Sequence, residues 1–282
     1  MMRETMALQR LPSDWQNWVR ENTTRGCDPE GMAREISSKL GLDLVSAEYA
    51  VAEAYLEQHP ERVVNTSCPH ISTTTGKIIT SDRTIDVLFA MGSPRIVLLG
   101  NVLGEEECDD LAAFGVGRFN RSKVLGVNGG GDQILETRTS ETAELQRAQS
   151  LLVSIIETRL AALANWPVEN GEPLQLQKYG VGNQYINHYD WFDPNEPTGV
   201  RHMQAGGQRL ATIILYLTDV EAGGGTAFPS IDVEVQPKKG NALFFINTNP
   251  YGMPNHKTLH AGLPVQKGCK IIASKWLRER AC

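Results

Sequence analysis

Residues 184–190 read Gln-Tyr-Ile-Asn-His-Tyr-Asp, a strand-like run that places a histidine and an aspartate two positions apart. In an extended strand, residues i and i+2 point to the same face of the sheet. His188 and Asp190 can therefore offer an imidazole nitrogen and a carboxylate oxygen to one metal ion. Two such ligands make a weak site, whereas a second histidine would complete the facial triad that leaves coordination positions open on Fe(II).

Two later histidines, His256 and His260, compete for the third position. Both follow several strand-like runs, so a double-stranded β-helix would return either of them to the same pocket. Their spacing favours His260 and leaves His256 open. Lys270 follows within another strand-like run. Because a buried lysine is costly without an anion, we expect its partner to be the carboxylate at the far end of an oxoacid co-substrate.

Short strand-like runs dominate the second half of the chain, and turn residues such as Gly180 and Gly240 separate them. The runs cover residues 174–179, 184–189, 209–217, 231–235, 241–246 and 270–277. Several short strands without intervening helices predict an antiparallel sandwich or barrel rather than a doubly wound parallel sheet.

The first part of the chain has helical patterning instead. Start and stop signals divide residues 12–58 into three segments, whose apolar stripes we interpret as packing surface. We expect a small helical region over residues 1–64, a linker or irregular cover over 65–93, and the main domain over 94–282.

The main domain is expected to carry supporting helices over residues 105–114 and 141–163, where apolar positions recur at helical spacing. A glycine-rich run at 128–131 predicts a flexible loop, because it lacks the strand-then-helix context of a phosphate-binding loop. The polar insertion at 192–207 has no pattern from which a conformation follows.

Composition argues against several classes of protein. The 282 residues carry a formal net charge of −6, unlike the basic surface of a general nucleic-acid binder. No apolar run approaches the roughly 20 residues needed to cross a bilayer, and the N-terminus shows no secretory signal. The five cysteines are scattered, which is typical of free thiols in a reduced compartment. We therefore expect a cytoplasmic protein that binds neither nucleic acid nor membrane, and the oligomeric state stays open.

Several motifs in one order resemble the prolyl 4-hydroxylase family of 2-oxoglutarate/Fe(II)-dependent dioxygenases, in its bacterial branch. The resemblance runs from about residue 96 to residue 279, and its landmarks are 179–180, 184–190, 206–209, 215–217, 223–229, 237–245, 259–265, Lys270 and 275–277. It implies an α+β fold with a distorted jelly-roll (double-stranded β-helix) core and supporting helices, beside the small helical N-terminal region. It also implies that His260, rather than His256, is the third metal ligand.

The resemblance implies a role for each matching position. The iron ligands match His188, Asp190 and His260. The residue that pairs with the distal carboxylate of 2-oxoglutarate matches Lys270, and hydroxyl-bearing positions beside that carboxylate match Tyr179 and Thr226. Positions on the substrate side of the pocket match Arg209, Tyr185 and Trp276.

The expected activity is hydroxylation of a prolyl residue in a peptide or protein. Fe(II) is the cofactor, 2-oxoglutarate and O2 are co-substrates, ascorbate serves as reductant, and succinate and CO2 are released. Two alternatives stay open: a hydroxylase of a free amino acid or small metabolite on the same scaffold, and a non-redox, metal-dependent cupin-like isomerase. Succinate formation under oxygen would separate the isomerase from both hydroxylases. The complete triad argues against an inactive binding module.

Overall fold

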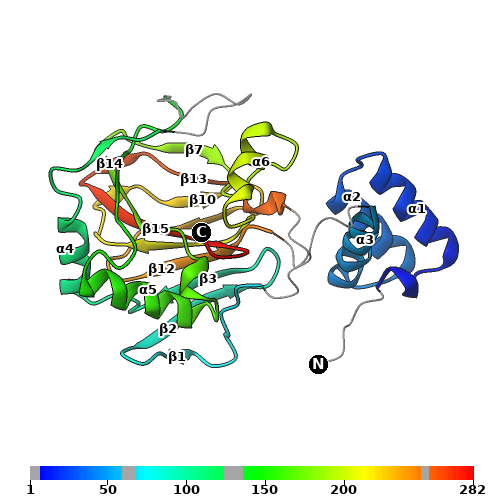
Figure 1. Cartoon of the computed structure of the whole chain (residues 1–282), viewed down its shortest axis with the longest axis horizontal. Coiled ribbons are helices and arrows are strands. Elements are labelled where there is room, and N and C mark those ends of the chain that lie inside the picture. The colour runs from blue at the N-terminus through cyan, green and yellow to red at the C-terminus, as the bar shows by residue number, and fades with distance from the viewer. Residues whose placement is uncertain (1–6, 59–67, 124–135, 249–253) are drawn as a thin grey trace. The chain divides into compact units, whose positions relative to one another are not determined.

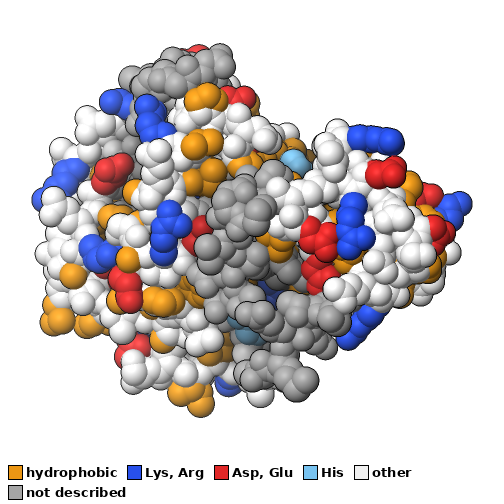
Figure 2. Space-filling model, turned by 45° about the vertical axis from the view of Figure 1, so that its right-hand side comes forward, with side chains coloured by type: hydrophobic (Ala, Val, Ile, Leu, Met, Phe, Trp, Pro, Cys, Tyr) orange, Lys and Arg blue, Asp and Glu red, His pale blue; other side chains and the backbone are white. Residues whose placement is uncertain are grey.

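The helical signals near the N-terminus and the strand signals after them correspond to two separate compact units, Met1–Thr66 with Pro250–Met253 and Ser67–Asn249 with Pro254–Cys282 (Figure 1). The computed structural model describes residues 7–58, 68–123, 136–248 and 254–282. The predicted glycine-rich loop at 128–131 lies outside these ranges. Within them, every helix is too short or too polar to cross a membrane. Basic and acidic side chains are interspersed over the face shown in Figure 2.

The first unit contains the three predicted helices, α1 (Ser13–Thr24), α2 (Pro29–Leu40) and α3 (Leu44–Gln58), after a short 3-10 turn, η1 (Leu8–Arg10). The Asp28 carboxylate accepts a hydrogen bond from the Gly31 backbone N–H and so caps α2. Val19, Ile36 and Ala50 are fully buried in a core that belongs to this unit alone. The helical prediction for residues 12–58 is confirmed.

The second unit is built on a nine-stranded antiparallel sheet with strand order β1-β2-β3-β12-β8-β15-β6-β5-β4. The strands are β1 (Lys77–Ile79), β2 (Thr84–Met91), β3 (Ile96–Gly100), β4 (Asn120–Arg121), β5 (Glu141–Glu144), β6 (Gln175–Tyr179), β8 (Arg209–Tyr216), β12 (Ala242–Ile246) and β15 (Lys270–Arg278). Strand β8 lies in the middle of the sheet, and its residues are almost all buried.

A four-stranded antiparallel sheet, in the order β11-β10-β13-β7, faces the large one. Its strands are β7 (Tyr185–His188), β10 (Thr226–Phe228), β11 (Val233–Val235) and β13 (His260–Gly262), while β9 (Ala222–Gly223) and β14 (Val265–Lys267) form a separate pair. One apolar core joins Tyr216 and Phe245 of the large sheet to Phe228 of the small one. The predicted antiparallel sandwich, a distorted jelly roll, is therefore confirmed.

Helices α4 (Glu105–Ala113) and α5 (Leu151–Leu163) cover the outer face of the large sheet, where Ile156 and Leu160 pack in one core with Ile213 and Phe244. The remaining elements are η2 (Val168–Asn170), α6 (Pro197–Gln204) and η3 (His256–Thr258). The α+β class is thus confirmed. Residues 192–207, for which the sequence predicted no conformation, contain α6.

The prediction of one helix over residues 141–163 is wrong in its first part. Residues 141–144 form β5, which pairs with β6, and α5 begins only after Ser150. The Ser150 hydroxyl accepts a hydrogen bond from the Val153 N–H and caps the helix. Ala148 has a positive φ of 50°, which is incompatible with a continuous helix.

The prediction of an irregular cover over residues 65–93 is wrong for residues 77–79 and 84–91, which form the antiparallel strands β1 and β2. A bulge between Val87 and Phe89 shifts the register of β2 against β3. Because a bulge interrupts the alternation of buried and exposed residues, the strand pattern is hard to recognise in the sequence.

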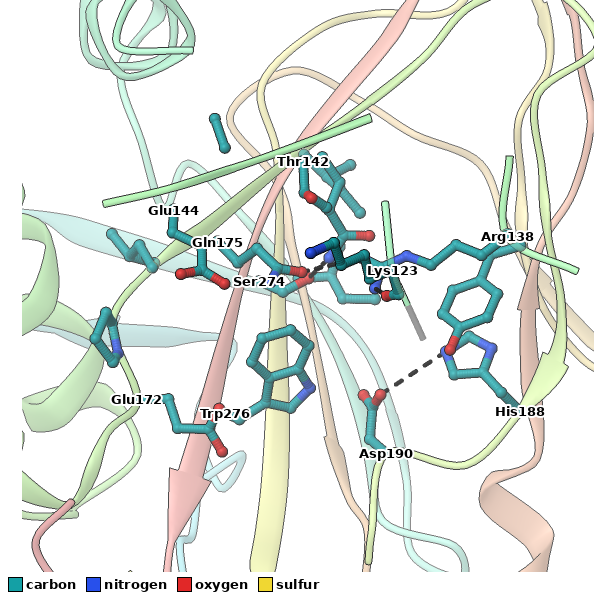
Figure 3. A pocket seen from close by; sticks show the side chains of 18 of the residues that line it. Lys123, Arg138, Thr142, Glu144, Glu172, Gln175, His188, Asp190, Ser274 and Trp276 are labelled. Carbon is teal, nitrogen blue, oxygen red and sulfur yellow. Dashed lines mark hydrogen bonds and ion pairs between the residues drawn. The ribbon is translucent and has the colours of Figure 1, made fainter. Parts of the chain in front are cut away.

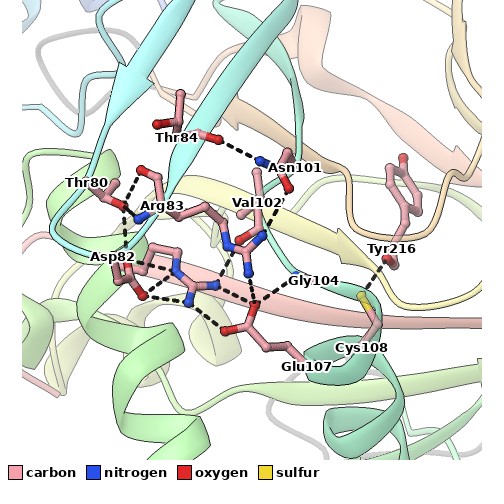
Figure 4. Close-up of polar contacts among 11 residues, drawn as sticks. Thr80, Asp82, Arg83, Thr84, Asn101, Val102, Gly104, Glu107, Cys108 and Tyr216 are labelled. Carbon is pink, nitrogen blue, oxygen red and sulfur yellow. Dashed lines mark hydrogen bonds and ion pairs between the residues drawn. The ribbon is translucent and has the colours of Figure 1, made fainter.

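Arg159 joins these outer elements through a network of ion pairs (Figure 4). Its side chain is 3% exposed and lies 2.6 Å from a carboxylate oxygen of Asp82 and of Glu107. It also donates to the Val102 carbonyl, and Arg83 forms a second ion pair with Glu107. The network ties α5 to α4 and to the β1–β2 hairpin, so it braces the sheet from the side opposite the small sheet.

Candidate active site

The small sheet brings His188 and His260 together, and Asp190 follows directly after its strand β7. Strands β7 and β13 are neighbours, and His260 pairs directly with His188 in their register. The His188 Nε2 lies 3.7 Å from Asp190 Oδ1, and the His260 Nε2 lies 3.6 Å from Asp190 Oδ2. These distances are too long for hydrogen bonds, but an ion about 2 Å from each ligand atom would span them. The three residues are the metal-binding group found within the described ranges.

Each histidine is held in the orientation that a metal requires by a carbonyl of its own strand region. The His188 Nδ1 lies 2.8 Å from the Ile186 carbonyl oxygen, and the His260 Nδ1 lies 2.9 Å from the Thr258 carbonyl oxygen. Since a carbonyl only accepts hydrogen bonds, Nδ1 carries the proton and Nε2 keeps its lone pair. Burial, together with the nearby His260 imidazole, lowers the pKa of His188 to about 3, so this ring is neutral at physiological pH.

The carboxylate of Asp190 is supported from behind by two polar residues of the large sheet. The Thr212 hydroxyl donates to Asp190 Oδ2 over 2.7 Å, and the Asn247 amide donates to the Thr212 oxygen over 2.9 Å. Burial acts to raise the pKa of Asp190, but the two imidazoles and the Thr212 hydroxyl outweigh it and lower the pKa. Two imidazoles and one ionised carboxylate on one side of an open pocket fit Fe(II), the ion for which this donor set is typical.

The triad and Lys270 line one cavity of about 1150 Å³. Figure 3 shows His188 and Asp190 of the triad facing each other in this cavity. Lys270 is 1% exposed, and its Nζ donates to the Gly224 carbonyl over 2.6 Å. Within the described ranges it forms no ion pair with a carboxylate, and burial lowers its pKa to about 8. A buried cation that faces a cavity and has no carboxylate partner among the described residues is a site for an acidic ligand.

Tyr179 and Thr226 lie in the same cavity as Lys270. The Lys270 Nζ is 5.3 Å from the centre of the Tyr179 ring. The Tyr179 hydroxyl donates to Gln177 Oε1, and the Thr226 hydroxyl oxygen accepts a hydrogen bond from the Tyr216 hydroxyl. Both predicted residues thus line the cavity together with Lys270, and the Thr226 hydroxyl could donate to a carboxylate bound there.

The three residues predicted for the substrate side also line this cavity. The Tyr185 ring stacks on the His188 imidazole at 3.5 Å. The Arg209 guanidinium lies 4.1 Å from the centre of the Trp276 ring, but Glu172 holds it in a bidentate ion pair at 2.7 and 2.8 Å. The Trp276 indole Nε1 is buried and has no hydrogen-bond partner among the described residues.

His256, the competing third ligand, does not reach the triad. It lies in η3, is exposed, and packs edge-on against the rings of Tyr189 and Trp191. The sequence analysis missed Thr212 and Asn247, the two residues behind Asp190. A threonine within the otherwise apolar run 210–217 was the available signal. A hydroxyl buried in an apolar core is costly unless it has a hydrogen-bond partner, so its presence indicates a polar group nearby.

Comparison with known proteins agrees with this geometry. The sequence profile of the 2OG-Fe(II) oxygenase superfamily matches residues 174–278. The chain is 36% identical over 202 residues to prolyl 4-hydroxylase 5 of Arabidopsis thaliana, an alignment that covers 65% of this chain and 68% of that protein. It is 37% identical over 187 residues to the prolyl 4-hydroxylase subunit alpha-1 of Gallus gallus, which covers 66% of this chain and 36% of the chicken subunit. The chain thus spans about a third of the length of that subunit.

A solved structure is also similar. The viral collagen prolyl hydroxylase of Paramecium Bursaria Chlorella virus-1, in complex with 2-oxoglutarate, superimposes with a TM-score of 0.52 and 30% sequence identity. The match covers 65% of this chain and 95% of the viral chain.

Proposed function

This chain belongs to the prolyl 4-hydroxylase family of 2-oxoglutarate- and Fe(II)-dependent dioxygenases, and we propose from that membership that it hydroxylates a prolyl residue in a peptide or protein. The observation that carries the proposal is the sharing of one cavity by the metal triad and the buried Lys270. When bound, iron and 2-oxoglutarate supply an oxidation that consumes dioxygen and releases succinate and CO2. Whether the chain falls in the bacterial branch of the family stays a prediction.

The residues of this chain bind and orient the reactants in this proposal. His188, Asp190 and His260 hold the metal on one side, which leaves its other positions open to the cavity. Lys270 pairs with the distal carboxylate of 2-oxoglutarate, and a charge-assisted contact in a water-poor pocket fixes the co-substrate firmly. Tyr179 and Thr226 lie beside that carboxylate.

The substrate occupies the part of the cavity lined by Tyr185, Arg209 and Trp276. A prolyl ring is apolar and fits against the aromatic faces of Tyr185 and Trp276, which line the cavity. The names of the relatives, all prolyl 4-hydroxylases, support a proline-containing partner. We include in the proposal ascorbate as reductant and a cytoplasmic location, which the unpaired cysteines support.

Anaerobic titration of the protein with Fe(II) and 2-oxoglutarate tests the metal and co-substrate assignment, because the ternary complex has a visible metal-to-ligand charge-transfer band. Oxygen is then admitted in the presence of proline-containing peptides, with succinate and peptide mass as readouts. We expect succinate in proportion to peptides that have gained one oxygen atom. Turnover of free proline but of no peptide would contradict the peptidyl assignment, and absence of succinate would contradict the dioxygenase assignment.

A further inference from the structure

The wall of the cavity next to His188 is basic, although the chain as a whole carries a formal net charge of −6. Four cationic side chains line this wall: Arg118, Arg121, Lys123 and Arg138. They come from β4 and from the segments just before and after the undescribed residues 124–135.

Arg138 is the most buried of the four, with 8% of its surface exposed. Its guanidinium donates to the Lys123 carbonyl and to Gln175 Oε1, both over 3.0 Å, and more weakly to the Ser140 hydroxyl. All of these acceptors are neutral. The guanidinium also lies 4.9 Å over the Tyr185 ring, which stacks on His188. A positive charge with no carboxylate partner among the described residues therefore lies one aromatic ring away from His188.

The other three cations are at most weakly paired. Arg118 and Lys123 form no ion pair within the described ranges, and both are exposed to the cavity. Arg121 lies 3.6 Å from Glu136, whose side chain is 94% exposed, so this pair is strongly screened. The charges of this wall are thus available to a ligand.

Three carboxylates line the cavity: the triad residue Asp190, Glu144 and Glu172. Figure 3 shows Arg138 on the same side of the pocket as His188, Lys123 nearer the middle beside Ser274, and Glu144 and Glu172 on the opposite side. Glu172 is already neutralised by ion pairs with Arg209 and Arg278. The part of the cavity around Lys123 and Arg138 therefore carries positive charge that has no carboxylate partner among the described residues, in addition to the charge of Lys270.

We infer that this cavity selects peptides that carry an acidic residue on one side of the hydroxylated proline, the side that lies against Lys123 and Arg138. The inference rests on the proposed function. Charges on the walls of a cleft focus the field inside it, which favours a complementary ligand in both encounter and binding. A nucleic acid would also carry negative charge, but its binding depends on many phosphate contacts along an extended basic surface, which this acidic chain lacks.

The test compares three matched proline peptides that carry Glu, Gln or Lys before the proline, and three that carry them after it. We expect the Glu peptide of one series to have a kcat/KM roughly five- to tenfold above its Gln analogue, with the Lys peptide lowest. The preference should shrink when the ionic strength rises to about 0.2 M, because exposed charges are then screened.

Two charge-reversal variants test whether the basic wall causes the preference for Glu peptides. Lys123→Glu should remove the Glu preference or reverse it in favour of Lys, because the exposed side chain of Lys123 can change without disturbing the core. Lys267→Glu makes the same change of charge on β14, outside the cavity, and should leave the preference intact. Binding of 2-oxoglutarate, followed by the charge-transfer band, should be equal in both variants.

Each alternative outcome has a distinct meaning. Equal kcat/KM for Glu, Gln and Lys peptides in both series would overturn the charge inference while the proposed prolyl hydroxylation stands. Loss of the preference in Lys267→Glu as well would assign it to net charge rather than to this wall. Stronger competition by a single-stranded RNA than by the Glu peptide would replace the acidic peptide with a nucleic acid. Succinate without hydroxylation of any peptide would overturn both proposals.

Discussion

Thr212 is the residue through which the large sheet acts on the metal site, because its hydroxyl donates to Asp190 and accepts from Asn247. Thr212→Val keeps the side-chain shape and removes both hydrogen bonds. We expect the affinity for a divalent metal to fall about 10- to 100-fold, the usual cost of losing a residue that orients a ligand. Titration with Mn(II) in the absence of oxygen measures this.

The matched control is Thr212→Ser, which keeps the hydroxyl and loses only a methyl group. It should bind the metal nearly as the unchanged chain does. If Thr212→Val and Thr212→Ser bind equally well, the hydroxyl does not support Asp190.

Lys270 makes binding of 2-oxoglutarate dependent on pH. Burial lowers its pKa from 10.5 to about 8, so the free site holds an uncharged amine above that pH. Because the co-substrate needs the ammonium form, the Kd should rise about tenfold per pH unit above pH 8. Calorimetric titration of the Mn(II)-loaded protein between pH 7 and pH 9.5 tests this, and a constant Kd over that range would refute it.

The lowered pKa of Lys270 also makes the free energy of unfolding depend on pH. Between about pH 8 and pH 10.5 the unfolded chain binds the Lys270 proton and the folded chain does not. The contribution of Lys270 to the free energy of unfolding therefore increases as the pH rises through this window, in the ligand-free protein.

Local sequence patterns predicted two residues of this site, whereas the third was decided only by the family resemblance. Alternation in a strand was enough to place His188 and Asp190 on one face, since that geometry is local. The choice between His256 and His260 was not local. It depended on the pairing of β13 with β7, and β13 has only three residues, too few to show an alternating pattern. The family resemblance, not the periodicity, indicated the correct histidine.

At the scale of elements, helix α5 is attached to the central strand β15 by a buried ion pair. Lys275 and Glu157 are each 2% exposed, and their charged atoms lie 2.6 Å apart. Lys275→Met leaves the Glu157 charge buried without its partner. We expect the free energy of unfolding to fall by about 3–5 kcal/mol, as measured by urea denaturation.

The double variant Lys275→Met/Glu157→Leu removes both charges and fills the space with apolar groups. It should recover most of the lost stability, because a buried ion pair is often replaceable by apolar packing. If the double variant is as unstable as the single one, the loss in the free energy of unfolding comes from packing rather than from the unpaired carboxylate.

The elements that the sequence predicted well are those with a local pattern. Helices α1 to α4 have enough residues to display a helical period, and strands β6, β7, β8, β12 and β15 are recognisable as strand-like runs between turn residues. Strand β5 was taken for the start of a helix, because Leu145 lies seven residues before Leu152 and so continues the apolar stripe of α5, and only pairing with β6 decides the matter. Strands β10, β13 and β14 have three residues each, so their existence depends on partners that are distant in the chain.

At the scale of the whole molecule, the division into two units predicts that the site does not need the N-terminal helices. Every residue of the triad and of the Lys270 pocket belongs to the second unit, whose core is separate from that of the first. A chain that begins at residue 67 should therefore bind Mn(II) and 2-oxoglutarate with unchanged affinity. A loss of more than about tenfold in either affinity, with the fold retained by circular dichroism, would show that the helices support the site.

The backbone carbonyls behind His188 and His260 have a consequence for how the protein acquires its metal. Each imidazole is oriented by a carbonyl oxygen only two residues earlier in the chain. The orientation of neither ring therefore depends on a bound ion. The backbone itself pre-orients the two imidazoles toward a metal ion. Loss of iron should therefore be readily reversible, and an apoprotein purified with chelator should regain full occupancy within the time of mixing rather than after a slow rearrangement.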